Sequence, residues 1–325
     1  MGYAQAKAID FETIPVIDIG PLRTGDSAGT LAVARALREA STVVGFFYVR
    51  NHGVADDVIA RAHDAAAAFF ALPEEEKRKV AVDRRHRGWL GAGGAKMHDG
   101  ARPDLKESFN WALELAPDDP DVSPEKPLLG PNNWPEAMPE LRPALSAYYD
   151  AMLGCGRDLV RGFALALDLP ESFFIDKYRK PLARGSIIHY PPQTADLGVE
   201  QFGVAPHTDY GCITLLWQDA NGGLQVRNRA GEWIAAPPIP GTFVINIGDL
   251  MARWTNDLFA STPHRVVNST GRERYSMPVF FDPDFDTVID CRECDPSTRE
   301  PRYPPTTAGA HVVGRFNAAF AYRNT

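Results

Sequence analysis

The chain has 325 residues, of which 44% are hydrophobic and 23% are charged, so it has ample material for a large folded core. Its 34 basic and 42 acidic residues give a net charge of −8, which argues against general binding to nucleic acid or to anionic membranes. No stretch approaches the ~18 consecutive apolar residues of a membrane-spanning helix, and no basic-then-apolar leader pattern opens the sequence. We therefore expect a cytoplasmic protein.

The first half of the chain mixes strand and helix patterns. Short apolar runs predict strands, and apolar residues at helical spacing predict helices. The predicted strands cover residues 14–20 and 43–53, and the predicted helices cover residues 30–42, 55–72 and about 139–169. Residues 83–135 are rich in Gly, Pro and Asp, so loops with short elements are expected there.

After residue 183 the pattern changes to short apolar or β-branched runs between turn signals. The runs are SIIHY, CITLLW, LQV, EWIAA, TFVINI, HRVV and YSMPVFF. Several short strands at this spacing predict a sandwich or barrel of antiparallel strands. Residues 311–323 have the pattern of a closing helix.

No polar linker separates the two halves, so a single domain is expected over residues 1–325. We expect a mostly helical N-terminal region, residues 1–180, packed on a β core formed by residues 181–290. A C-terminal tail and helix, residues 291–325, would complete the domain.

The four cysteines, at positions 155, 212, 291 and 294, are too sparse for a disulfide framework. Cys291 and Cys294 form one CxxC, with neither a second CxxC nor a nearby histidine. This pattern favours two reduced thiols over a structural zinc site, and their role stays open.

One of the eight histidines is followed two residues later by a carboxylate, in His207-Thr208-Asp209. On a strand these alternate positions face the same side, so the imidazole and the carboxylate would converge. A distant histidine would complete a 2-His-1-carboxylate triad, which leaves open positions on Fe(II). His264, at the start of a strand-like run, is the candidate. An HxD triplet alone often arises by chance, and a lone histidine is more often structural.

Arg274 and Ser276 follow in the run RYSMPVFF. Strand alternation predicts that they share one face with Pro278 and Phe280. A guanidinium and a hydroxyl on one face can bind a carboxylate through charge-assisted hydrogen bonds. For an RxS pair alone, an ordinary surface arginine is the commoner explanation.

Residues 206–283 carry these motifs in order, and related runs occur upstream in FFYVRNHGV, FFALPEEEK, DLKESFNW and IIHYPP. Taken together, nearly the whole chain resembles the isopenicillin N synthase-like branch of the Fe(II)/2-oxoglutarate-dependent dioxygenases. The resemblance implies a mainly β fold with flanking helices. Its core would be a distorted double-stranded β-helix, or jelly roll, with N-terminal and C-terminal helices.

The resemblance also implies roles for the candidate residues. His207, Asp209 and His264 would bind Fe(II), and Arg274 and Ser276 would hold the far carboxylate of 2-oxoglutarate. The implied enzyme consumes O2 and 2-oxoglutarate and oxidises a small organic molecule, most often by hydroxylation. Succinate and CO2 would be released.

Tyr190 matches a tyrosine that supports the cosubstrate in relatives with an NxYP motif, although Ile188 stands at the Asn position here. A buried strand aromatic is the equally weighted alternative for Tyr190. Trp89, Phe109 and Phe280 are candidates for the substrate pocket, the first two because their region resembles the family's substrate-covering segment. Filling of the core is an equally good explanation for these three.

Two other functions remain open. One is an Fe(II) oxidase of the isopenicillin N synthase type, which uses no 2-oxoglutarate and binds its substrate with the RxS pair. The other is a non-catalytic metal-binding or sensor protein, which the complete set of candidate ligands disfavours. The expected partner is a small-molecule substrate, with no nucleic acid and no membrane. The substrate, the choice among hydroxylation, desaturation and cyclisation, and the oligomeric state stay open.

Overall fold

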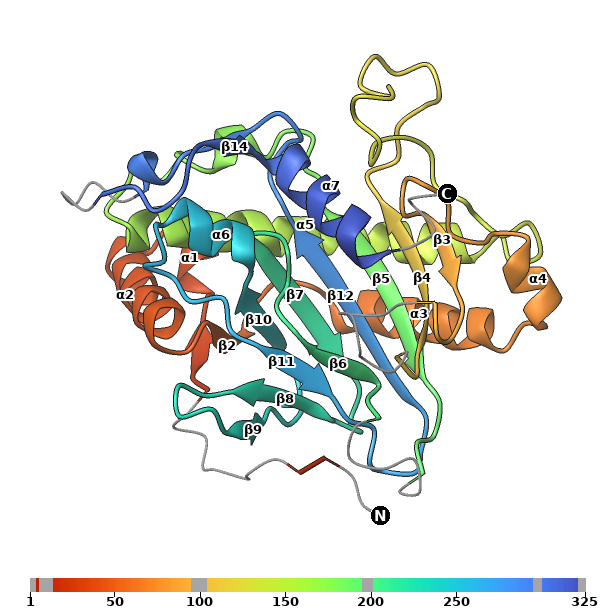
Figure 1. Cartoon of the computed structure of the whole chain (residues 1–325). Coiled ribbons are helices and arrows are strands. Elements are labelled where there is room, and N and C mark those ends of the chain that lie inside the picture. Colours follow the sequence, from red (N-terminus) through yellow and green to blue (C-terminus); the bar gives the residue numbers. More distant parts are fainter. Residues whose placement is uncertain (1–3, 6–13, 95–103, 195–200, 295–299, 321–325) are drawn as a thin grey trace.

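Two facing β-sheets form the centre of the molecule, as the computed structural model shows (Figure 1). The structure describes residues 4–5, 14–94, 104–194, 201–294 and 300–320. Within these residues the larger sheet has eight strands in the order β1-β2-β10-β7-β12-β5-β4-β3. The smaller sheet has four, in the order β6-β11-β8-β9, and β13 and β14 form a separate pair.

Both sheets are largely antiparallel, and the pairing of β1 with β2 is parallel. The larger sheet consists of β1 (Val16–Asp18), β2 (Phe46–Arg50), β3 (Gly88–Leu90), β4 (Glu107–Ala112), β5 (Arg184–Tyr190), β7 (Ile213–Gln218), β10 (Phe243–Ile247) and β12 (Arg274–Phe281). The smaller sheet consists of β6 (Val204–His207), β8 (Leu224–Arg227), β9 (Trp233–Ala235) and β11 (His264–Val266). The remaining pair is β13 (Val288–Ile289) with β14 (Thr306–Thr307).

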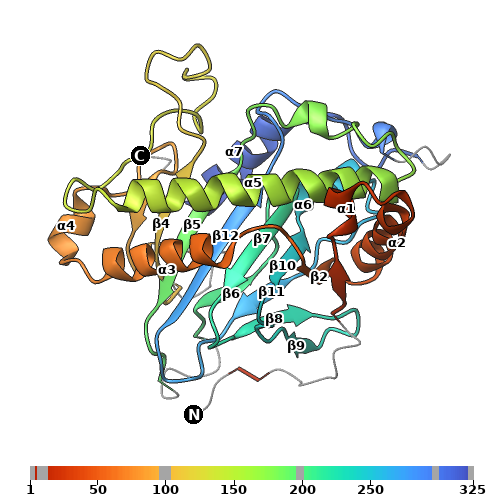
Figure 2. The ribbon, with the colours of Figure 1, turned by 180° about the vertical axis from the view of Figure 1, so that it is seen from behind.

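Helices cover the outer face of the larger sheet, where Figure 2, seen from behind, shows α5 crossing in front of the strands beside α2 and α3. The helices are α1 (Pro21–Thr24), α2 (Ser27–Val43), α3 (Asp56–Phe70), α4 (Glu74–Arg78), α5 (Leu141–Ala166), α6 (Asp249–Trp254) and α7 (Ala308–Ala319), with short 3-10 turns η2 (Ile175–Lys177) and η4 (Cys291–Glu293). Asp26 caps α2 by accepting a hydrogen bond from the Gly29 amide. None of the described helices is both long and apolar enough to cross a membrane.

The central strands of the larger sheet carry apolar residues on both sides, because both faces of the sheet are covered. On β2, Phe47 and Val49 belong to the large core under the helices, whereas Phe46 and Tyr48 belong to a smaller core between the sheets. This alternation is the ordinary period of two along a strand. It leaves the inner face of the larger sheet as a wall that can carry functional side chains.

The mainly β fold with flanking helices that the sequence predicts is confirmed. The N-terminal region adds more than helices, because β1, β2, β3 and β4 all join the larger sheet. The closing helix spans Ala308–Ala319, so it begins earlier than predicted, and residues 321–323 of the prediction lie outside the described residues.

One buried hydrogen bond ties the longest helix to the centre of the sheet. The hydroxyl of Tyr148 on α5 donates to the carbonyl of Met277 on β12 over 2.7 Å, and both residues are fully buried. Tyr148→Phe would leave this carbonyl without its partner in an apolar setting. We expect the free energy of unfolding to fall by about 1–3 kcal/mol, measured by urea denaturation. An unchanged denaturation midpoint would show that this bond does not stabilise the packing of α5.

Candidate metal centre

Two histidines of the smaller sheet lie directly opposite each other. His207 is the last residue of β6, His264 is the first of β11, and the two are paired in the sheet register. The Oδ1 atom of Asp209 lies 3.6 Å from Nε2 of His207 and 3.7 Å from Nε2 of His264. One donor atom from each residue lies within 4.8 Å of the other two. The described residues contain no other such group of His, Cys, Asp or Glu.

Asp209 reaches this position for a different reason than strand alternation. Strand β6 ends at His207, and Asp209 lies in the turn that leads to β7. Its Oδ2 atom accepts hydrogen bonds from Asn246 on β10 over 2.7 Å and from Thr214 on β7 over 2.5 Å. The larger sheet therefore holds one carboxylate oxygen and leaves Oδ1 directed at the histidines.

Both imidazoles are oriented by backbone carbonyls. Nδ1 of His207 lies 2.8 Å from the Ala205 carbonyl, and Nδ1 of His264 lies 3.3 Å from the Thr262 carbonyl. A carbonyl only accepts hydrogen bonds, so each Nδ1 carries a proton and each Nε2 is the ring nitrogen that faces Asp209. A metal-ligating histidine usually makes such a hydrogen bond through the ring nitrogen that does not bind the metal.

The protonation states suit metal binding. Removal from water, followed by the effect of His264, lowers the pKa of His207 to about 3, so its ring is neutral near pH 7. Removal from water opposes ionisation of Asp209. The adjacent histidines and the hydrogen bonds from Thr214 and Asn246 nevertheless hold its pKa below the ordinary value. A neutral His207 imidazole and an ionised Asp209 carboxylate, with His264 opposite them, form a two-histidine, one-carboxylate donor set of the kind that Fe(II) oxygenases use.

Arg274 is buried in the inner wall with one unsatisfied donor. Its Nε atom donates to the Gly222 carbonyl, and its Nη2 atom donates to Oε1 of Gln218 over 3.3 Å. Its guanidinium carbon lies 4.5 Å from the centre of the Tyr190 ring. The buried Nη1 atom has no hydrogen-bond partner in the protein. Leaving such a donor unpaired costs about 1–3 kcal/mol, so this position indicates a ligand acceptor.

Arg274, Ser276 and Tyr190 surround one end of a cavity of about 150 Å³ that also contains the three metal-ligand candidates. The Ser276 hydroxyl lies 3.5 Å from the Tyr190 hydroxyl. Ile188, which replaces the family's asparagine, contributes apolar surface to the same wall. The residues expected to hold iron and 2-oxoglutarate thus line one cavity.

The three aromatic candidates for the substrate pocket separate into two groups. Phe280 lines the cavity, whereas Trp89 and Phe109 are absent from its described wall. Trp89 donates a 2.8 Å hydrogen bond to Glu107, and Phe109 packs on Phe69 in the large core. Their assignment is therefore corrected. Phe109 alternates with inward-facing neighbours on β4, so it must point outward.

Several cavity residues were not identified from the sequence. They include Lys106, Ser108, Asn110, Arg184, Ser186, His86, Tyr210, Phe316 and Phe320. Alternation along β4 and β5 could have indicated those on the strands. No sequence signal links His86 to Phe316 and Phe320, whose ring centres lie 4.6 Å and 4.8 Å from its own.

Helix α7 closes one side of the cavity and is attached to the loop that carries Asp209. Nε2 of His311 lies 3.0 Å from the Tyr210 carbonyl. Arg315 forms a 2.9 Å ion pair with Asp249, and its guanidinium carbon lies 4.5 Å from the centre of the Tyr210 ring. The last described helix and the candidate metal loop are therefore held together.

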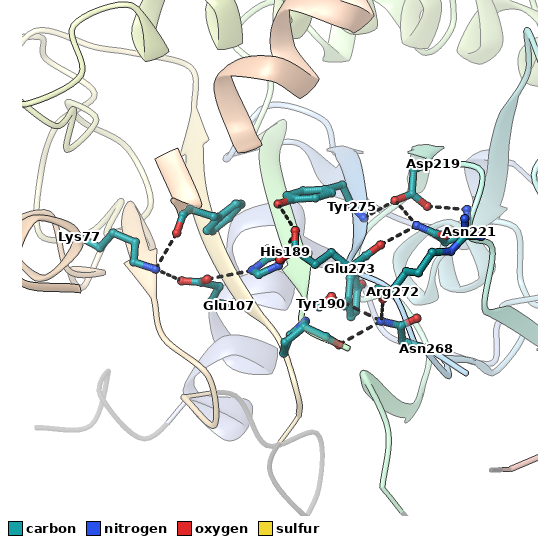
Figure 3. A network of polar contacts seen from close by, with 12 residues as sticks. Lys77, Glu107, His189, Tyr190, Asp219, Asn221, Asn268, Arg272, Glu273 and Tyr275 are labelled. Carbon is teal, nitrogen blue, oxygen red and sulfur yellow. Dashed lines mark hydrogen bonds and ion pairs between the residues drawn. The ribbon is translucent and has the colours of Figure 1, made fainter. Parts of the chain in front are cut away.

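A second polar network supports the same strands from the outer face (Figure 3). Glu107 on β4 accepts hydrogen bonds from Lys77 over 2.8 Å and from Nδ1 of His189 on β5 over 3.0 Å. The His189 ring stacks on Tyr275 of β12, with centres 5.0 Å apart. His189 and Tyr275 alternate with Tyr190 and Arg274, so the two groups occupy opposite faces. His189 therefore has a structural role on the face of the sheet that points away from the cavity.

Two family descriptions match the chain. Residues 14–137 match the family described as the N-terminal region of the non-haem dioxygenase in morphine synthesis. Residues 177–283 match the 2OG-Fe(II) oxygenase superfamily. A 2-oxoglutarate-Fe(II) type oxidoreductase of Emericella nidulans is 36% identical over 94% of this chain and 90% of its own length. A homoarginine-6-hydroxylase of Oryza sativa subsp. japonica is also 36% identical, over 94% of this chain and 96% of its own.

The structure is also similar to solved structures of a protein from Neurospora crassa. The complex of that full-length protein with α-ketoglutarate superposes with a TM-score of 0.85 at 29% identity, covering 97% of this chain and all of that one. The complex that also contains thymine gives a TM-score of 0.82 at 30% identity, over 96% of this chain and 99% of that one. The similarity therefore extends over almost the whole chain.

The hydrogen bonds to Asp209 can be tested directly. Asn246→Ala removes a donor from Oδ2, so the carboxylate loses part of its fixed orientation. We expect Fe(II) affinity, measured by anaerobic titration, to fall roughly tenfold to a hundredfold. Asn228→Ala, in the turn between β8 and β9, serves as the control. Equal affinities for the two variants would contradict an orienting role for Asn246.

Proposed function

This chain belongs to the 2OG-Fe(II) oxygenase superfamily, and we propose that His207, Asp209 and His264 bind its iron. The observation that carries the proposal is the convergence of three donor atoms, one from each residue, all within 4.8 Å of one another. Three ligands from one side leave positions open for other groups.

The protein is an Fe(II)- and 2-oxoglutarate-dependent oxidoreductase. When bound, iron and 2-oxoglutarate together supply O2-dependent oxidation of a small organic substrate, with release of succinate and CO2. The relatives named for 2-oxoglutarate, and the α-ketoglutarate complexes of the Neurospora crassa protein, favour this activity over the oxidase that uses no cosubstrate.

Arg274, in this proposal, neutralises the carboxylate of 2-oxoglutarate that lies away from the iron. A buried carboxylate is costly unless it is paired and hydrogen bonded. The Nη1 atom of Arg274 offers an unused donor, and stacking on Tyr190 fixes the plane of the guanidinium. Ser276 and Tyr190 add hydroxyl groups beside it. A guanidinium is suited to this task because it can donate two parallel hydrogen bonds.

The apolar part of the wall limits the access of water to the reacting atoms. Between the metal-ligand candidates and Arg274 the cavity is lined by Phe46, Ile188, Leu216, Leu224 and Val266. Such a lining strengthens electrostatic interactions and protects reactive species. The side chains thus bind, orient and shield, and none of them is required as a general acid or base.

The substrate is proposed to be a small molecule that enters the cavity beside α7. The Neurospora crassa protein was solved with thymine bound, and the rice relative is named for hydroxylation of homoarginine. The end of the cavity away from Arg274 is lined by Phe280, Phe316 and Phe320. Hydroxylation of a C–H bond is the reaction that we propose for it.

The metal assignment predicts a clear ranking of histidine variants. His207→Ala, Asp209→Ala and His264→Ala should each lose most Fe(II) affinity and all substrate oxidation, because two remaining ligands hold iron poorly. His63→Ala, at a half-buried position of α3 outside the cavity, should bind iron like the parent protein. Anaerobic Fe(II) titration measures the affinities. Retention of iron by His264→Ala, together with its loss from His189→Ala, would show that the third ligand is misassigned.

The cosubstrate assignment predicts graded effects at Arg274. Arg274→Lys keeps the charge but not the forked geometry, so it should weaken 2-oxoglutarate binding, and Arg274→Ala should weaken it further. Breaking a buried charged pair costs about 3–5 kcal/mol, which corresponds to a hundredfold or more. Ser276→Ala should weaken 2-oxoglutarate binding less than either arginine variant, because it removes one neutral donor.

The measurements are 2-oxoglutarate affinity and succinate yield for each variant. Fe(II) affinity in the absence of cosubstrate should change little, since Arg274 is not a ligand. Unchanged 2-oxoglutarate affinity in Arg274→Ala, with loss of substrate binding instead, would support the oxidase function in which this pair holds the substrate.

A further inference from the structure

The inner face of the larger sheet carries a second buried arginine, at the end opposite Arg274. In the pairing of β5 with β12, Arg274 lies opposite Tyr190, and Arg184 lies opposite Phe280. The two pairs are six residues apart on each strand, or about 20 Å at the ordinary rise of a strand. Both arginines line the same cavity. Because Arg274 is assigned to 2-oxoglutarate, Arg184 faces the part of the cavity left for the substrate.

Aromatic rings hold the guanidinium of Arg184 in a fixed plane. Its central carbon lies 4.7 Å from the centre of the Phe280 ring and 4.6 Å from that of Phe316. One ring comes from β12 and the other from α7. An arginine held in this way loses little side-chain entropy when it binds a ligand, because its orientation is already set.

The surrounding wall offers positive charge and polar groups. Lys106, Ser108 and Asn110 occupy alternate positions leading into and along β4, and Ser186 follows Arg184 on the same face of β5. Asn110 donates to the Gly88 carbonyl and to the Ser108 hydroxyl, so the protein holds these polar groups in place along the cavity wall.

The carboxylates that balance these cations lie behind the wall. Asp282 is 3.7 Å from Arg184, and Asp104 is 3.3 Å from Lys106, but neither contributes to the described cavity lining. Among the described lining residues the only carboxylate is Asp209, which is assigned to iron. A substrate therefore meets the positive side of each pair.

We propose that Arg184 is a specificity-determining residue and that the substrate is a compact, planar molecule presenting two acceptor oxygens to it. These oxygens belong to a carboxylate or to ring carbonyls, both of which a guanidinium can bind through its forked donors. A cationic substrate is disfavoured, since it would meet Arg184 and Lys106 with no carboxylate other than Asp209 among the described lining residues. This inference rests on the proposed function, because it needs iron and 2-oxoglutarate at the other end of the cavity.

Compactness follows from the size of the cavity. Its volume of about 150 Å³ is shared with the cosubstrate. Pockets for drug-sized ligands commonly measure ~300–1,000 Å³. A planar substrate is favoured because Phe280, Phe316 and Phe320 line this end of the cavity, and the face of a flat molecule can pack on such rings.

The test compares four probes on the Fe(II)- and 2-oxoglutarate-loaded protein without O2. Benzoate offers a carboxylate, thymine offers ring carbonyls, benzamidine is the cationic counterpart of benzoate, and homoarginine carries a flexible cation. Dissociation constants are measured by calorimetry for the parent protein and for Arg184→Lys, Arg184→Met and Arg35→Met. Arg35 is an exposed residue of α2 and serves as the control. Thermal melting checks that each variant is folded.

We expect benzoate or thymine to bind the parent protein and both cations to bind much more weakly. Benzoate binding alone would identify the carboxylate, and thymine binding alone would identify ring carbonyls. Arg184→Met should raise the dissociation constant of the probe that binds on the order of tenfold to a hundredfold. Arg184→Lys should raise it less, and Arg35→Met should leave it unchanged. If Arg184→Met does not remain folded, the loss of probe affinity in Arg184→Lys decides whether Arg184 binds the probe.

Preference for benzamidine or homoarginine, failure of both benzoate and thymine, or equal affinities in the Arg184 and Arg35 variants would overturn the inference. Binding of 2-oxoglutarate to the parent protein is measured in parallel. Its failure would count against the proposed function, whereas normal 2-oxoglutarate binding with unchanged probe affinities would count only against Arg184.

Discussion

The carboxylate of Asp209 connects the two sheets at the candidate iron site. Its Oδ2 atom is held by Thr214 and Asn246 of the larger sheet, and its Oδ1 atom faces the histidines of the smaller sheet. The donor set therefore exists only when the sheets are packed at the correct distance. The apolar core between the sheets, which includes Phe46 and Val266, sets that distance. Folding and preparation of the site are consequently one process.

The cations that line the cavity differ in how their charge is balanced. Arg184 and Lys106 are balanced by carboxylates behind the wall, whereas Arg274 contacts neutral groups and has one unused donor. Arg274, which has no carboxylate partner among the described residues, is therefore the cation that we propose to pair with an anionic ligand. The outer network around Glu107 holds the same strands in register from the opposite face (Figure 3).

The parts of the site that depend on local patterns could be predicted from the sequence. Alternation along β12 correctly grouped Arg274, Ser276 and Phe280, and the family motifs indicated the fold. Strand alternation does not explain the orientation of Asp209. Its carboxylate is oriented by a hydrogen bond from Asn246, which lies 37 residues away in the sequence. No local pattern reports a hydrogen bond of that kind.

The substrate side of the cavity was harder to predict. The loop-rich composition of residues 83–135 suggests a substrate-covering segment with Trp89 and Phe109, but β4 is a strand whose alternation turns Phe109 outward. Phe316 reaches the cavity from near the end of the chain, and His86 comes from a turn in which its backbone has a positive φ of 62°. Such contacts depend on tertiary packing, so they appear only in the structure.

The position of α7 has a consequence for how such enzymes diversify. The strands and their connecting turns supply the candidate metal ligands and the arginine proposed to bind the cosubstrate, whereas the segment around α7 supplies Phe316 and Phe320 to the cavity wall. Substitutions in this segment alter the shape offered to a substrate without shifting the register of any sheet. A lineage can therefore acquire new substrates through Phe316 and Phe320, while His311 and Arg315 of the same helix keep the loop that carries Asp209 in place.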